Sequence, residues 1–196
     1  MEKKIKRNMS KFKNPMPVQD AGVRSKNFEE VSLGYTMEIA LDEARRCIDC
    51  KEPKCVPGCP VNIDIPGFIR ELSLGNMKKS NDILLDSSCL ASVCGRVCPQ
   101  ESQCEKGCIR NIKGESVAIG RLERFVSDYA REHDLVNFEI PKQNGHKIAI
   151  VGSGPSGLAC AGDLAKLGYD VTIFEALHLT GGVLSYGIPE FRLPRS

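Results

Sequence analysis

The sequence lacks a long apolar run, a large excess of charge of either sign, and any repeat or low-complexity tract. No apolar stretch approaches the roughly 18 residues of a membrane-spanning helix, so we expect no membrane partner. The formal net charge of +2 gives no reason to expect nucleic acid or an anionic surface as a partner. The basic N-terminus, MEKKIKRNMSKFK, has no apolar segment of the secretory type, which predicts a cytoplasmic protein.

Two further absences bear on the kind of functional site to expect. No nucleophile stands beside a base, so we expect no catalysis by side chains. The histidines, His133, His146 and His178, all lie away from the cysteines. The cysteines themselves are many, ten in all, and most of them fall into two short clusters. In a reducing compartment this density predicts metal binding rather than disulfides.

The two clusters have spacings that suit iron–sulfur centres. The first, spaced C-x2-C-x4-C-x3-C-P, consists of Cys47, Cys50, Cys55 and Cys59. The second, spaced C-x3-C-P-x4-C-x3-C, consists of Cys94, Cys98, Cys104 and Cys108. Each four-iron cluster takes four soft thiolates, so these cysteines could hold two [4Fe-4S] clusters. The remaining two, Cys89 and Cys160, are expected to be buried core residues.

Zinc is the rival metal, and it would make the chain an interaction module without redox chemistry. Structural zinc sites favour paired C-x2-4-C units, often with histidine. The x4 and x3 spacings here do not fit that pattern. The C-P endings instead resemble the ferredoxin run, whose last cysteine binds the other cluster. We therefore favour iron–sulfur chemistry over the zinc alternative.

The apolar run KIAIV at 147–151 predicts a buried strand. A glycine-rich loop, GSGPSG, follows it and opens a predicted helix at 155–167. A second parallel strand is predicted at 170–174, and an acid ends it. This β-α-β order predicts a dinucleotide site, and the acid suits a ribose without a 2′-phosphate, as in FAD or NAD. The candidate cofactor-binding residues are Gly152, Gly154, Pro155, Ser156, Gly157, Glu175, Gly181 and Gly182.

Each glycine of this loop has an expected task. Gly152 would permit the tight turn after the strand, Gly154 would let the backbone approach a pyrophosphate, and Gly157 would let helix and strand pack closely. Helix N-terminal amides would then face the phosphates. The plainer alternatives are a solvated carboxylate for Glu175 and an ordinary turn for Gly181 and Gly182.

The rest of the sequence predicts a helical first part. Apolar spacing and end signals favour helices at about 36–46, 66–75, 77–85 and 115–132, and Thr36 is the expected N-cap of the first. The last of these helices has an expected apolar stripe at helical spacing, formed by Ile119, Leu122, Phe125, Val126 and Tyr129. We expect an irregular arm over 1–34 that packs on another part of the protein and has solvated lysines. Residues 88–111 are expected to be mostly turns, and 137–146 a linker. The expected domains are a mostly α-helical iron–sulfur domain at 1–140 and, at 141–196, the start of an α/β Rossmann-like FAD-binding domain.

Four motifs occur in the order seen in one family: CIDCKEPKCVPGCPVNIDIPGFI, CGRVCPQESQCEKGC, IGRLERFVSDYA and VGSGPSGLACAGDLAKLGYDVTIFEALHLTGGVLSYGIPEFRLP. They resemble the small (beta) subunit of NADPH-dependent glutamate synthase. The same module occurs in dihydropyrimidine dehydrogenase and in the large subunit of NADH-dependent ferredoxin:NADP oxidoreductase. The resemblance implies a helical domain with two [4Fe-4S] clusters, then an FAD domain and an NADPH domain.

The resemblance also implies a function. Electrons from NADPH would pass through FAD and the clusters to a partner, the large subunit of glutamate synthase, for glutamate synthesis. The alternative is a subunit of the electron-bifurcating ferredoxin enzyme, with another redox partner. The family's FAD domain continues beyond Ser196, and no second GxGxxG is present. We therefore expect a fragment that is inactive alone and holds FAD weakly or not at all.

The resemblance finally implies a ligand set. In dihydropyrimidine dehydrogenase a glutamine in the helix after the last cysteine holds one cluster, and IGRLERF places Glu123 at that position. One cluster would then be held by Cys47, Cys50, Cys55 and Glu123. The other would be held by Cys59, Cys98, Cys104 and Cys108. Cys94 would be a neighbour, and it remains the alternative eighth ligand.

Overall fold

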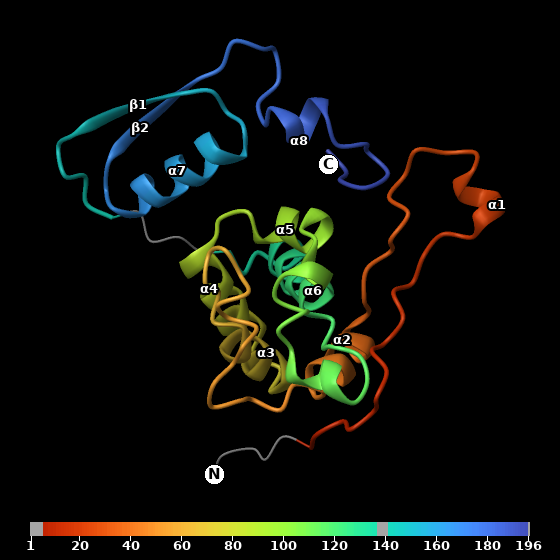
Figure 1. Cartoon of the computed structure of the whole chain (residues 1–196). Helices are drawn as coiled ribbons and strands as arrows, with labels where there is room; N and C mark the ends of the chain where they lie inside the picture. The colour runs from red at the N-terminus through yellow and green to blue at the C-terminus, as the bar shows by residue number, and fades with distance from the viewer. Residues whose placement is uncertain (1–5, 137–140, 196) are drawn as a thin grey trace. The chain divides into compact units, whose positions relative to one another are not determined.

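The computed structural model describes residues 6–136 and 141–195 of the chain (Figure 1). These residues form two compact units, one of 6–27 with 31–136 and one of 28–30 with 141–195. The linker expected at 137–146 lies partly outside the described residues, and 141–146 form neither helix nor strand. The expected domain limits stay a prediction.

The first unit is built from helices, as the sequence predicts (Figure 1). Thr36 caps the N-terminus of its second helix, where the hydroxyl accepts a hydrogen bond from the Ile39 amide at 3.4 Å. That helix ends two residues before the predicted Arg46. The helices are α1 (Ala21–Arg24), α2 (Met37–Ala44), α3 (Ile65–Ser73), α4 (Met77–Ser87), α5 (Ala91–Val97) and α6 (Ile119–Glu132), with short 3-10 helices at Gln100–Ser102 and Ile109–Ile112.

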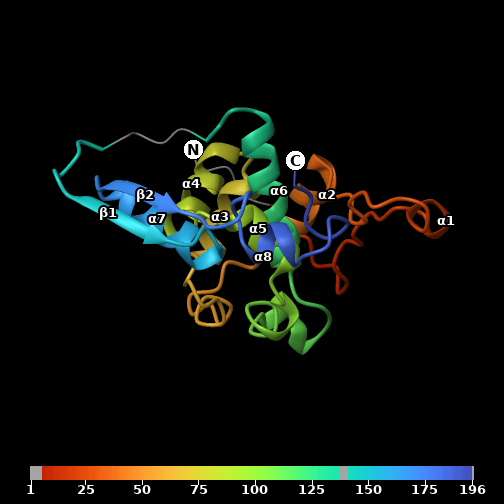
Figure 2. The same ribbon diagram turned by 90° about the horizontal axis from the view of Figure 1, so that it is seen from above.

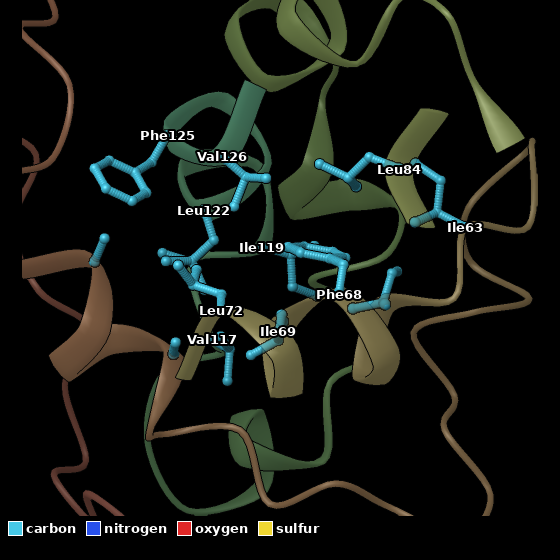
Figure 3. Packing of buried hydrophobic residues seen from close by; sticks show 14 of the residues in the cluster. Ile63, Phe68, Ile69, Leu72, Leu84, Val117, Ile119, Leu122, Phe125 and Val126 are labelled. Carbon is cyan, nitrogen blue, oxygen red and sulfur yellow. The ribbon is translucent and has the colours of Figure 1, made fainter. Parts of the chain in front are cut away.

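The core of this unit lies between α6 and α3 (Figure 3). The apolar stripe predicted for α6 is buried at Leu122 and Val126, which face Phe68 and Leu72 of α3. Burying large aliphatic and aromatic side chains contributes roughly 1.5–3 kcal/mol each, so this contact is a main source of stability. It also holds α6 in place against α3.

Helix α5 corrects the expectation of turns over 88–111. Its N-terminus has no side-chain cap, and a helix this short is not stable by itself. The helix is held by α6 instead. A Cβ on Gly95 would lie 2.5 Å from the Arg124 amide nitrogen, so the two backbones touch there. Arg96 also makes a two-pronged ion pair with Asp128 of α6, at 2.8 and 2.7 Å.

The N-terminal arm packs on the helical unit, as expected, but Lys13 corrects the expectation that its lysines are solvated. Lys13 Nζ lies 2.6 Å from Oε2 of the buried Glu105. The Lys13 amide donates to the Glu115 carboxylate at 2.8 Å, and the Lys11 carbonyl accepts from the Glu115 amide at 2.7 Å. The arm therefore covers the segment that follows the second cysteine cluster.

The second unit contains the predicted β-α-β arrangement. Strands β1 (Lys147–Val151) and β2 (Asp170–Phe174) pair in parallel, with Lys147 opposite Asp170. They lie side by side, and α7 (Pro155–Lys166) covers one face (Figure 2). A short helix, α8 (Val183–Tyr186), follows.

Two burial expectations for this unit are wrong. Val151 of the strand expected to be buried is 90% exposed, and Phe174 is 58% exposed. Cys160, expected in a core, is also exposed. Two strands and one helix cannot enclose an apolar core, because an isolated strand pair has too few neighbours to cover both faces.

Among the residues described, no helix has the length and apolar character needed to cross a membrane.

Candidate iron–sulfur site

No disulfide joins the ten cysteines, all of which lie within the described residues, and the eight clustered ones lie on two segments of the helical unit. The first segment, 47–60, joins α2 to α3, and the second, 94–108, begins on α5. Two glycines, Gly58 and Gly107, lie where the two segments are in contact. A Cβ on Gly58 would lie 3.0 Å from the Gln103 carbonyl oxygen and 3.2 Å from the Cys104 Cα. A Cβ on Gly107 would lie 2.4 Å from the Lys54 carbonyl oxygen.

This reciprocal contact interlocks the two segments, which we call the cysteine loops. Gly58 precedes Cys59 and rests on the second loop beside Cys104. Gly107 precedes Cys108 and rests on the first loop beside Cys55. Each loop therefore delivers its last cysteine to the sulfurs of the other loop.

The first group of thiols consists of Cys47, Cys50, Cys55 and Cys108. Burial raises the pKa of Cys55 to about 12, and the charges of Cys108 and Cys47 raise it further. Burial raises the pKa of Cys47 to about 11, and Cys108 again adds to the shift, while a hydrogen bond from the Asp49 backbone opposes it. The four thiols are thus close enough for their charges to interact.

The second group contains five donors: Cys59, Cys94, Cys98, Cys104 and Glu123. Burial raises the pKa of Cys94 to about 12, and the charges of Glu123, Cys98 and Cys59 raise it further. Burial also raises the pKa of Cys104 to about 12, with smaller contributions from Glu105 and then Glu123. Cys98 has a raised pKa for the same reasons, burial first and Glu123 second.

Glu123 is an unusual helix residue. Its side chain projects from α6 into the second group and is only 6% exposed. Burial raises the pKa of its carboxyl to about 8. Within residues 6–136 and 141–195, Oε1 is one of three buried side-chain polar atoms without a hydrogen-bond partner. Such an atom is costly unless something binds it.

The structure places Glu123 and Cys108 beside other cysteines than the resemblance implies, and the division of the ligands stays a proposal. Glu123 was expected beside Cys47, Cys50 and Cys55, but it interacts with Cys94, Cys98 and Cys104. Cys108 was expected in the second group, but it interacts with the first. The physical reason is the interlocking of the loops together with the contact of α5 on α6. The sequence did hold a signal, since a glycine precedes each cysteine that crosses over.

These donor sets fit cubane clusters. In the part of the chain that the structure describes, no three His, Cys, Asp or Glu side chains converge on a single metal ion. A cluster of four irons and four sulfides is larger than one ion, so its ligands stand further apart than four ligands around zinc. Soft thiolates, and a buried carboxylate oxygen without a partner, are suitable ligands for such a cluster.

We predict that Gly107→Ala removes the cluster held by the first group. The new Cβ would lie 2.4 Å from the Lys54 carbonyl oxygen, so the backbone beside Cys55 must move. Iron should fall from about eight to about four per chain in the anaerobically purified protein. Lys106→Ala is the matched control, because the adjacent Lys106 is exposed and should keep all the iron. Full iron in Gly107→Ala would contradict the interlocked arrangement.

The glycine-rich loop of the second unit has the geometry expected of its glycines. Gly152 has φ +96°, which a side chain would strain. A Cβ on Gly157 would lie 2.1 Å from the Gly152 carbonyl oxygen, so the start of α7 lies against the end of β1. Nothing lies within 4 Å of a Cβ on Gly154, so its backbone is open to a ligand. Pro155 begins α7, and Ser156 is exposed beside it.

The Glu175 carboxylate accepts hydrogen bonds from the glycine-rich loop and from the residues that follow β2. The Ser153 amide donates to Oε2 at 2.9 Å and the Leu177 amide donates to Oε1 at 2.8 Å. Hydrogen bonds, the Ser153 hydroxyl first, lower the pKa of the Glu175 carboxyl to about 2. The role of Glu175 toward a ribose stays a prediction. Sequence reasoning missed the buried Ser153, because it occupies an unspecified position of the motif.

The glycine pair after β2 also approaches the loop. Gly181 and Gly182 both have positive φ, 109° and 54°. A Cβ on Gly182 would lie 2.9 Å from the Gly154 Cα, and the Gly181 amide donates to the Ser153 carbonyl at 3.1 Å. Only glycine allows this close approach, which places the pair beside the open face of Gly154.

Comparison with known families matches both units. Residues 24–135, more than half of the chain, match the family described as dihydropyrimidine dehydrogenase domain II, 4Fe-4S cluster. Residues 150–195 match an NAD(P)-binding Rossmann-like domain.

Three relatives show the range of similar proteins. The NADPH-Fe(3+) oxidoreductase subunit beta of Geobacter sulfurreducens is 43% identical over 92% of this chain and 27% of its own length. The NAD-dependent dihydropyrimidine dehydrogenase subunit PreT of Escherichia coli is 38% identical over 86% of this chain and 41% of its own. The glutamate synthase [NADPH] small chain of Escherichia coli is 35% identical over 91% of this chain and 38% of its own.

The chain thus spans less than half the length of each of these relatives. All three carry names of oxidoreductases, and the resemblance to the glutamate synthase small chain is confirmed. With its eight clustered cysteines on a helical unit and a Rossmann-like segment after it, the chain belongs to the family of dihydropyrimidine dehydrogenase domain II, a 4Fe-4S cluster domain.

Proposed function

We propose that this chain is the electron-transfer part of a flavin and iron–sulfur oxidoreductase similar to the glutamate synthase small chain. Electrons from NADPH would pass through FAD and two [4Fe-4S] clusters to a partner subunit. The observation that supports this proposal is the pair of donor groups that the interlocked cysteine loops bring together. When bound, iron–sulfur clusters accept single electrons, and a flavin divides a hydride into two of them.

In this proposal the first cluster is held by Cys47, Cys50, Cys55 and Cys108, and the second by Cys59, Cys98, Cys104 and Glu123. The chain's own residues would bind the clusters, orient them and shield them from water. Cys104 is buried and Cys55 is half-buried, which limits the access of water to the sulfurs, one of the means by which proteins set cluster potentials. Glu123 adds an oxygen ligand and a negative charge to the second cluster only.

The second unit would bind the ADP portion of FAD. The open backbone at Gly154 and the N-terminus of α7 offer amides to a pyrophosphate. The close passage of Gly181 and Gly182 keeps side chains away from that space. To reach a ribose hydroxyl, Glu175 would exchange at least one of its bonds to the Ser153 and Leu177 amides for one to the ligand.

The partner would be a subunit that receives single electrons, such as the large subunit of glutamate synthase or another redox subunit. Several relatives carry names of enzyme subunits, which supports a partner of this class. The match to the NADPH-dependent small chain supports NADPH as the electron source of the whole protein.

The proposal predicts the metal content of the chain. Anaerobically purified protein should contain about eight iron and eight sulfide per chain, and dithionite should produce the EPR signals of reduced cubanes. Iron, sulfide and zinc are measured on the same sample. About two zinc per chain without sulfide, in protein never exposed to oxygen, would overturn the proposal and favour the zinc-stabilised interaction module.

A further inference from the structure

The second donor group holds one more ligand side chain than a cluster needs. A [4Fe-4S] cluster takes four ligands, one for each iron. Cys94 lies on α5 four residues before Cys98, and α5 touches α6 beside Glu123, which places Cys94 next to the same group. Cys59, Cys98, Cys104 and Glu123 complete a cluster without it, so Cys94 lies beside the site with no assigned task.

The backbone of α5 presents Cys94 and Cys98 together. The two residues are one helical turn apart, and the Cys98 amide donates to the Cys94 carbonyl at 3.0 Å. Side chains four positions apart in a helix lie on the same face. The Gln100 side-chain amide also donates to the Cys94 carbonyl, at 2.9 Å, and so fixes the end of this turn. A cluster bound by Cys98 would therefore lie on the helix face that carries Cys94.

The contact of α5 with α6 brings Cys94 to Glu123. The two helices touch where Gly95 meets the Arg124 amide, and a Cβ on Gly95 would lie only 2.5 Å from that nitrogen. Cys94 immediately precedes Gly95, and Glu123 immediately precedes Arg124. The thiol and the carboxyl are therefore held at the same helix crossing, by a contact that admits only glycine.

Glu123 gives independent evidence that a ligand binds at the crossing of α5 and α6. It is 94% buried, since only 6% of it is exposed, and its Oε1 belongs to the few buried polar atoms of the described residues that have no partner. An oxygen in that position is costly to bury unless it binds something. Cys94 lies at the same helix crossing, because Gly95 beside it touches Arg124 beside Glu123.

We propose that Cys94 is a reserve ligand of the second cluster, able to replace Glu123 on one iron. This rests on the proposed function. In the exchange a bond forms between the Cys94 sulfur and the iron, and the bond from the Glu123 carboxylate oxygen to that iron breaks. The proton of the Cys94 thiol passes to the Glu123 carboxylate, and no electron is transferred. A soft thiolate then stands where an oxygen stood, which changes the electronic state of the cluster.

The test uses iron content and EPR of the anaerobically purified chain. Glu123→Ala should keep about eight irons, with an altered signal for one of the two reduced clusters, because Cys94 binds in place of the carboxylate and its proton goes to solvent. Cys94→Ala should keep about eight irons and the original spectrum. The double variant Glu123→Ala/Cys94→Ala should fall to about four irons or convert the second cluster to a three-iron form.

Controls separate this inference from the proposed function. Glu123→Gln keeps an oxygen donor and should keep the iron without needing Cys94. Cys89→Ala removes a nearby thiol that is not placed in the ligand set. If Glu123→Ala alone loses four irons, or if the double variant keeps both clusters, Cys94 is not a reserve ligand. If the unaltered chain holds no second cluster, the proposed function itself fails.

Discussion

In a background that lacks Cys47 and Cys55, the further change Cys108→Ala is expected to have no effect on iron content. The background removes two ligands of the first group, so only the second cluster should remain, with about four irons per chain. Cys108 interacts with the first group, because Gly107 rests on the first loop beside Cys55. Its removal should therefore leave the remaining cluster and its EPR signal unchanged.

The matched comparison adds Cys98→Ala to the same background. Cys98 lies in the second group with Glu123 and Cys59. Its loss should therefore lower the iron below about four or change the signal to that of a three-iron form. The opposite pattern, in which Cys108→Ala damages the remaining cluster, would restore the division of ligands that the resemblance implies.

Replacing Arg46 by Met is expected to destabilise the helical unit by about 3–5 kcal/mol. Arg46 and Glu43 form an ion pair at 2.6 Å, and both side chains are fully buried. Arg46 also donates to the Ser116 carbonyl at 2.9 Å and to the Glu115 carbonyl at 2.8 Å. Removing one member leaves the other charge buried without its partner, which is costlier than losing the pair as a whole.

The measurement is the thermal unfolding midpoint of the anaerobic, iron-loaded protein, monitored by far-UV circular dichroism. A loss of this size should lower the midpoint by roughly 10 °C or more. Arg45→Met is the control, because the neighbouring Arg45 is exposed and should change the midpoint by little. Equal midpoints for the two variants would show that the buried pair adds no net stability.

The elements of the fold could be predicted well where their cause is local. Both strands have the predicted bounds, because apolar runs and flanking turn residues define them. Thr36 caps α2 as predicted, because capping needs only the backbone nearby. Helix α5 could not be predicted, because the packing of Gly95 on α6 stabilises it, and no pattern within α5 shows that contact.

The candidate site was predictable in composition but not in arrangement. Spacing alone picked out the eight clustered cysteines, and the resemblance added Glu123. Which cysteines share a cluster depends on where two loops touch, and that contact joins residues far apart in the sequence. The contacts of the N-terminal arm could not be predicted for the same reason. Lys13 is typical of a solvated lysine until folding brings it to the buried Glu105.

The interlocked cysteine loops have a consequence for how the protein matures. Neither donor group can be completed by one loop, so each bound cluster would act as a cross-link between distant parts of the chain. Cross-links of this kind restrict the unfolded ensemble more than the folded state. Metal loading and folding would then be a single coupled event. Oxidative damage to one cluster would remove its cross-link and so lower the stability of the helical unit, while the ligands of the other cluster stay in place.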